Sequence, residues 1–230
     1  SSLEYNNYTY TNIITNGTFQ KKYFSREIKI DDPNLDFTST LEIDLTKQLP
    51  RFNIVGDLTH SNLKALNILT NTKDSIQLIG VLDVNFTGTT IDNFLGTAKF
   101  LNATINDGPT KLSFDSLNLV SSYIDSVKSL HLGSNDFNAT ISGKFSIIDL
   151  PASFQGFLNH YYPTYIKPPK SIPQNQQFSF VINTNYIEPY LPLLSKKITG
   201  FNDASITGSV DTRNNQLGLV AKIPSAKFGN

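Results

Sequence analysis

The sequence predicts a mostly β protein whose long, curled, antiparallel-rich sheet forms an open apolar groove. Apolar and polar residues alternate with a period of two over most of the 230 residues, as in strands with one buried face. Glycine recurs on the apolar parity of these runs. Only one or two short amphipathic segments interrupt the strand pattern, so we expect one or two short inserted helices.

The stretch "IQLIGVLDVNF" (76–86) shows the pattern most clearly, with an apolar series that Gly80 interrupts. Gly56, Gly143 and Gly208 take the same position in "FNIVGDL", "ATISGKFSI" and "ASITGSVD". Glycine weakens a strand interior, so its recurrence suggests a bend, a bulge or a close approach of another group. We therefore expect all four glycines to let the strands curve.

Three segments are expected along the chain. Residues 1–150 form a β-groove segment, although residues 1–36 carry little that places them. Residues 151–175 hold an amphipathic helix and a proline-rich connector. The helix is predicted from the helical spacing of four residues that we expect to insert into the groove: Phe154, Phe157, Leu158 and Tyr161. Residues 176–230 continue the β-groove, with a short helix near 188–196.

The apolar parity predicts which side chains line the groove and take an apolar ligand. These are Ile54, Leu58, Ile76, Leu78, Leu82, Val84, Phe86, Phe137, Ile141, Phe145, Ile147, Phe178, Phe180, Ile182, Ile206, Val210, Leu217 and Leu219. The purely structural alternative is that the same residues form the closed core of a β-sandwich.

Composition argues against most chemical functions. Lysine plus arginine and aspartate plus glutamate number 19 each, so no net field favours nucleic acid. The chain has no cysteine, and His60, His131 and His160 lack metal-ligand spacing. His131, Ser134 and Asp136 are close in sequence, whereas the members of a catalytic triad usually come from separate elements. We expect no catalytic residues, no metal and no cofactor.

The order of motifs in "GVLDVNFTGTTIDNFLGTAKFLNATI" (80–105), "LHLGSNDFNATISGKFSIIDLPASFQGFLNHYYP" (131–163), "FSFVINTNYIEPYLPLL" and "DASITGSVDTRNNQLGLVAKIP" resembles the TamB proteins. The resemblance is strongest to their Bacteroidetes forms, within the AsmA-like group, and covers residues 37–225. It implies a β-taco-like groove in a periplasmic fragment of a large protein anchored in the inner membrane. Ser1 opens the chain without an initiator or signal peptide, which fits an internal or C-terminal-region fragment.

The resemblance also implies a function without catalysis. TamB proteins are associated with phospholipid passage between the inner and outer membranes and with outer-membrane protein assembly. The implied partners are phospholipid or another acyl-chain ligand, nascent outer-membrane proteins, and an outer-membrane barrel of the BamA/TamA type. The alternative from the residues alone is a closed β-domain that acts as a structural, adhesin or glycan-binding module.

Overall fold

A computed structural model describes residues 1–68, 75–108, 110–161, 163–164, 167–171, 173–191 and 198–228. The side chains at positions 19, 91, 107, 110, 157, 158, 161 and 228 lie outside the described part.

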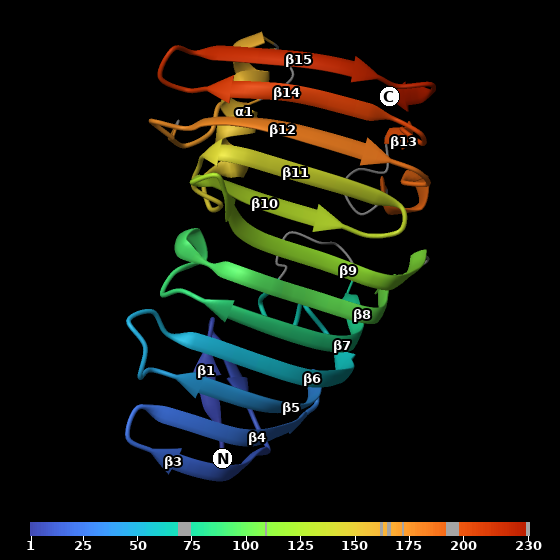
Figure 1. Cartoon of the computed structure of the whole chain (residues 1–230). Coiled ribbons are helices and arrows are strands. Elements are labelled where there is room, and N and C mark those ends of the chain that lie inside the picture. The colour runs from blue at the N-terminus through green and yellow to red at the C-terminus, as the bar shows by residue number, and fades with distance from the viewer. Residues whose placement is uncertain are drawn as a thin grey trace. The chain divides into compact units, whose positions relative to one another are not determined.

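Among the described residues, twelve strands form one antiparallel sheet in the order β15-β14-β12-β11-β10-β9-β8-β7-β6-β5-β4-β3 (Figure 1). The sheet is open, with β3 and β15 as its edges, which confirms the predicted fold class. The strands are β3 (Ile13–Gln20), β4 (Tyr23–Asp32), β5 (Leu35–Asp44), β6 (Arg51–Ser61), β7 (Ile76–Thr87), β8 (Leu95–Asp107), β9 (Thr110–Ile124), β10 (Val127–Gly133), β11 (Phe137–Lys144), β12 (Gln177–Thr184), β14 (Ser205–Asp211) and β15 (Gln216–Lys222).

Shorter elements surround the sheet. The α-helix α1 covers Leu150–Tyr161, close to the predicted helix. The predicted helix near 188–196 is a 3₁₀ turn at Glu188–Tyr190 in the described residues, and 192–197 lie outside them. A further 3₁₀ turn, Ile91–Asn93, and two small sheets, β1 (Leu3–Tyr5) with β2 (Tyr8–Tyr10) and β13 (Ile198–Gly200) with β16 (Ala226–Phe228), were not predicted.

The chain divides into two compact units inside β9, whereas the segments predicted from the sequence meet at residues 150 and 175. Unit 1 comprises residues 1–89 and 95–119, and unit 2 comprises 90–94 and 120–230. Unit 2 begins before residue 150 because β10 and β11, which precede the helix, pack with the elements that follow it. Both belong to the core that α1 covers.

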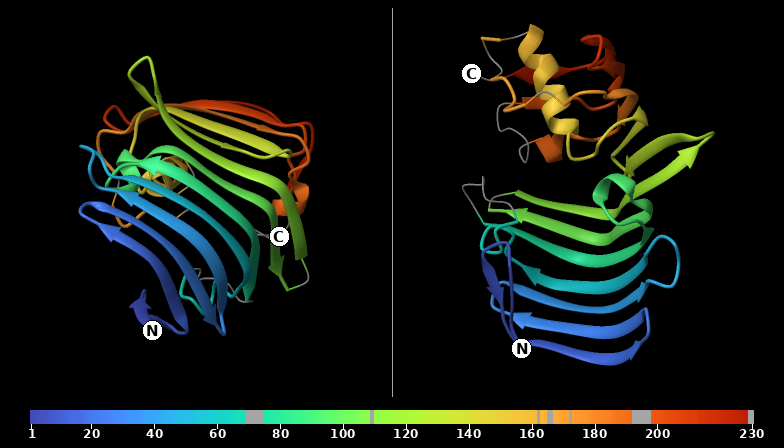
Figure 2. Two further views of the ribbon diagram at one scale, coloured as in Figure 1. Left: turned by 60° about the horizontal axis from the view of Figure 1, so that its bottom comes forward. Right: turned by 90° about the vertical axis from the view of Figure 1, so that its left-hand side faces the viewer.

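Side chains of unit 1 alternate between two faces of its sheet because the strands pair in register. Phe52 lies opposite Phe86, Ile54 opposite Val84, and the odd-numbered residues between them share the other face. The Phe52 and Phe86 rings stack with their centroids 4.7 Å apart. Figure 2 shows that these strands bend along their length.

An irregularity in pairing lies at Gly80. The β7–β8 register shifts between Ile79 and Val81, where β8 contains an extra residue near Asn102. Gly80 has φ 146° and Asn102 φ 48°. The apolar parity of the sequence changes at Phe100–Leu101, next to this bulge, because one extra residue moves the side chains that follow it to the opposite face.

The other three recurring glycines make room for aromatic rings or backbone of the next strand. A Cβ on Gly56 would lie 2.6 Å from the Phe37 ring, and one on Gly208 would lie 2.5 Å from the Phe180 ring. At Gly143, whose φ is 139°, a Cβ would lie 2.7 Å from the Cα of Phe178. Close approach of an aromatic residue, rather than strand curvature alone, therefore requires these glycines.

Hairpin β1–β2 is fastened to unit 1 by the buried carboxylate of Asp32. Asp32 is 5% exposed. It accepts hydrogen bonds from the Tyr8 hydroxyl, from the N–H and hydroxyl of Thr11 at 2.9 and 2.8 Å, and from the Asn34 N–H at 2.9 Å. Burial alone would raise the pKa of Asp32, but these hydrogen bonds outweigh it and lower the pKa.

We expect Gly208→Ala to destabilise unit 2 by about 1–3 kcal/mol, because the new methyl group overlaps both the Phe180 ring and the main-chain oxygen of Gly218. Gly218→Ala on neighbouring β15 is the control. Its Cβ would meet only the Ser209 hydroxyl oxygen, at 3.0 Å, so its effect should stay within about 0.5 kcal/mol. Urea unfolding measures both. Equal losses of stability in the two variants would contradict the proposed need for glycine at position 208.

We expect the hairpin to detach in acid. Folding lowers the pKa of the Asp32 carboxyl group. The ionised carboxylate therefore stabilises the hairpin fully at a pH above the ordinary aspartate pKa of about 3.9, and this stabilisation is lost as the pH falls through the lower pKa of the folded state. Asp32→Asn should detach the hairpin at neutral pH and abolish this acid response, whereas exposed Asp31→Asn should not. The NMR signals of the Tyr8 and Tyr10 rings report detachment. Signals that stay unchanged in acid would refute this role of Asp32.

Candidate functional site

The candidate site is one face of unit 1, which we call the apolar face. Register places its members on one side of β4–β7. They are Ile28, Ile30, Phe37, Leu41, Ile43, Phe52, Ile54, Leu58, Leu78, Leu82, Val84 and Phe86. All are half-buried except Val84, which is 9% exposed.

The partial exposure of these apolar side chains to solvent indicates that no other layer of the protein covers them fully. In a two-layer β-domain the inward side chains of central strands are mostly buried. The described part of unit 1 contains no helix and no second large sheet to cover its apolar face. The only other sheet there, hairpin β1–β2, meets one end of β4 at Asp32 and lies on the side towards which the strands bend (Figure 2, left).

One basic residue lies among the apolar side chains of this face. Arg26 is paired with Gly17 and Leu41 in the neighbouring strands. Its guanidinium carbon lies 5.2 Å from the centroid of the Phe24 ring, a cation–π arrangement. The apolar face is therefore bordered near β3 by a positive charge.

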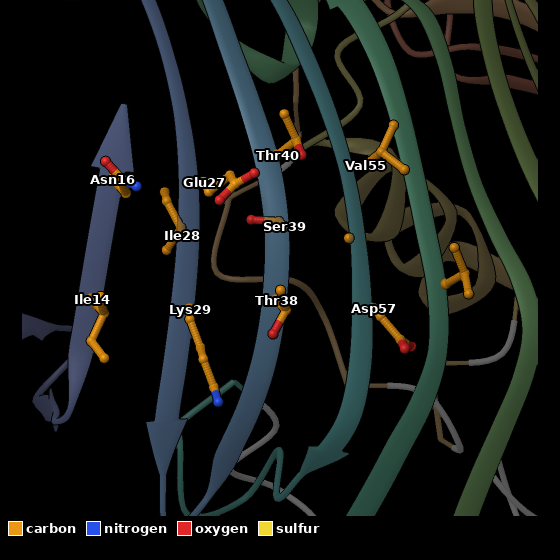
Figure 3. Close-up of a pocket in the computed structure, with 12 residues that line it drawn as sticks. Ile14, Asn16, Glu27, Ile28, Lys29, Thr38, Ser39, Thr40, Val55 and Asp57 are labelled. Atoms are coloured by element: carbon orange, nitrogen blue, oxygen red, sulfur yellow. The ribbon is translucent and has the colours of Figure 1, made fainter. Parts of the chain in front are cut away.

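A hollow of about 470 Å³ lies on the opposite face of unit 1 (Figure 3). Of the predicted site residues, only Gly56 borders it. Most of its side chains come from the other parity of the strands, among them Ile14, Glu27, Lys29, Val55 and Asp57. Ile28, Ser39 and Gly56, which lie on the parity of the apolar face, also border it. Ile14 is 64% and Val55 47% exposed. The sequence prediction missed this hollow because its apolar residues are scattered singly among charged ones.

In unit 2 the predicted lining residues form a covered core, so within the described residues the apolar face of this part of the sheet is filled by packing rather than open. Phe145, Phe178, Phe180 and Val210 are between 1% and 7% exposed. Packed against them are Leu130, Ile141, Ile147, Leu150, Phe154, Ile182, Ile206 and Leu217.

Helix α1 provides the cover. The Phe154 ring meets those of Phe178 and Phe180 edge to face, with centroids 5.8 and 5.3 Å apart, a favoured aromatic geometry. Phe157, Leu158 and Tyr161, also predicted on this helix, have side chains outside the described part. Their contribution to the cover therefore stays a prediction.

The remaining predicted residues lie at the margins of the two units. Ile76 is 8% exposed, at the end of β7. The Phe137 ring packs edge to face with that of Tyr190, with centroids 6.2 Å apart. Leu219, on edge strand β15, is 57% exposed. It lies opposite Gly208, beyond the core residues around Phe180.

The described residues contain no group of three or more histidine, cysteine, aspartate or glutamate side chains placed to bind a metal. His131, considered with Ser134 and Asp136, instead contacts the Thr140 hydroxyl at 2.9 Å. No helix in the described part is both long and apolar enough to cross a membrane.

Comparisons with known proteins found no matching protein family, no matching curated protein and no matching solved structure.

Removing the aromatic cover should destabilise unit 2 selectively. Phe154→Ala should cost about 3 kcal/mol, because it exposes the rings of Phe178 and Phe180. Hydrogen exchange measures the effect: β12 amides should exchange faster while β6 amides in unit 1 do not change. The exposed substitution Gln155→Ala on the same helix is the control. Unchanged exchange in β12 would show that Phe154 is not needed to cover the core.

Proposed function

We propose that the apolar face of unit 1 binds the acyl chains of phospholipids and that the protein acts without catalysis. The observation that carries this proposal is the partial exposure of a continuous apolar surface over four paired strands. Contiguous exposed apolar surface is uncommon on soluble proteins and commonly marks an interaction site.

The arrangement of the face favours an extended apolar ligand over a compact one. Its side chains run across successive strands, which are spaced about 4.8 Å apart, and form a surface rather than an enclosed pocket. Each methylene group moved from water onto such a surface contributes up to about 0.8 kcal/mol. A long acyl chain can collect many such contributions, and association costs reduce the total.

The wider setting that we propose is an envelope-spanning bridge of the TamB type. The motif resemblance and the open antiparallel sheet both support it. In this setting the chain is a periplasmic part of a protein anchored in the inner membrane, and it carries phospholipid between the two membranes. Support of outer-membrane protein assembly, with a barrel of the BamA/TamA type, would use the same surface.

Leu82→Asp should weaken phospholipid binding by about tenfold or more, because it places a charge at the centre of the apolar face. The fold should survive, since Leu82 is half-buried and lies opposite Gly56. Native mass spectrometry after incubation with phospholipid, followed by organic extraction, measures bound lipid. Circular dichroism checks the fold.

Ile14→Asp is the matched control. It introduces the same charge in unit 1, but on the face that carries the hollow and opposite Lys29. We expect it to bind lipid like the parent. Loss of binding in Ile14→Asp but not in Leu82→Asp would place the ligand in the hollow and overturn the proposal, and so would a parent protein that binds no lipid.

A further inference from the structure

Unit 2 contains a second cavity, of about 530 Å³, at the ends of its strands. Five segments meet there: the 3₁₀ turn at 91–93, the end of β9, the start of β10, the end of β11 and the start of β12. The lining residues are Asp92, Tyr123, Ser126, Val127, Lys128, Gly143, Lys144, Phe145 and Gln177. Asp125 and Ser126, with φ 48° and 66°, form the tight turn from β9 to β10.

Lys128 is the unusual residue of this cavity, because its charge is buried without a carboxylate partner. The residue is 9% exposed. Its ammonium donates a hydrogen bond to the main-chain oxygen of Asp92 at 2.6 Å and lies 4.7 Å from the centroid of the Phe145 ring. Among the described residues it forms no other hydrogen bond and no ion pair, although an ammonium group has three donors. A buried cation of this kind is costly unless an anion compensates it.

The nearest carboxylate is already bound elsewhere. Asp92 accepts a hydrogen bond from the Ile147 N–H at 2.6 Å and another from the Ser146 hydroxyl at 3.0 Å, one on each oxygen. Thr90 and Asn93 hold the turn around Asp92 through reciprocal hydrogen bonds. The carboxylate is therefore fixed on the 146–147 segment, while the main-chain oxygen of the same residue faces the ammonium of Lys128.

Burial lowers the pKa of Lys128, and the negative charge of Asp92 offsets only part of this effect. A bound anion would stabilise the charged form. Lys144 adds a second positive charge to the cavity wall, and Tyr123, Ser126 and Gln177 add neutral donors. With Lys128, Lys144 and Asp92 counted, the lining carries a formal charge of +1.

We propose that this cavity binds a phosphate ester, with Lys128 and Lys144 as its cationic ligands. A phosphate group offers several acceptor oxygens, which match two ammonium groups and the neighbouring hydroxyl and amide donors. The cavity has room for the organic part of the ester beside the phosphate. The site lies wholly in unit 2 and uses no residue of the apolar face. The proposal of phosphate-ester binding can therefore be tested separately from the proposal of acyl-chain binding.

The test compares four proteins: the parent, Lys128→Met, Lys144→Gln and Lys99→Gln. Methionine keeps the apolar stem of Lys128 and removes its charge. Exposed Lys144→Gln tests the site without disturbing the core, and exposed Lys99→Gln in unit 1 is the control. Isothermal titration with inorganic phosphate and with glycerol 3-phosphate measures binding of soluble ligands. Flotation with phosphatidylcholine vesicles, with or without phosphatidic acid, measures binding of a lipid headgroup.

We expect Lys128→Met and Lys144→Gln each to weaken phosphate-ester binding by about tenfold, with Lys99→Gln unchanged. Binding of glycerol 3-phosphate without vesicle binding would identify a soluble ester as the ligand. Binding only to vesicles that contain phosphatidic acid, dependent on Lys128 or Lys144, would identify a headgroup. If Lys128→Met fails to fold, the binding measured for Lys144→Gln decides whether the cavity binds the phosphate ester. The proposal is overturned if no probe binds, or if Lys99→Gln loses as much affinity as Lys144→Gln.

Discussion

A single-layer β-sheet with period-two alternation must present one apolar face, and the structure depends on how each unit deals with that face. In unit 2, α1 lies on the apolar face and Phe154 meets the rings of Phe178 and Phe180. In unit 1 the equivalent face is only partly buried across β4–β7, apart from Val84 and Ile76 of β7, which are 9% and 8% exposed. The same strand pattern therefore gives a closed core in one unit and an open surface in the other.

The fold class could be predicted from the sequence because alternation and glycine placement are local signals. Alternation along 76–86 identified the faces of β7, and the change of apolar parity at Phe100–Leu101 lies where β8 has its extra residue. The role of Gly56 and Gly208 was less visible, because each is set by an aromatic ring on a neighbouring strand. Alternation within one strand does not show which ring of the next strand approaches it.

The candidate site was only partly predictable for the same reason. A pattern of apolar residues shows which side chains share a face, but not whether another element covers that face. Ile54 and Ile141 have the same pattern around them, yet Ile141 packs against a covered core and Ile54 lies on the open face. Lys128 gave no signal at all, since its burial results from distant residues, Asp92 and Phe145, that the fold brings to it.

The most direct test of the central claim, that the two units differ in access to their apolar faces, is photo-crosslinking with a phospholipid that carries a photoreactive group in its acyl chain. Mass spectrometry then maps the adducts. The account predicts adducts on peptides from β4–β7 and few on those from β12 and β14, whose apolar residues α1 covers. Equal labelling of both sets, or none on β4–β7, would contradict it.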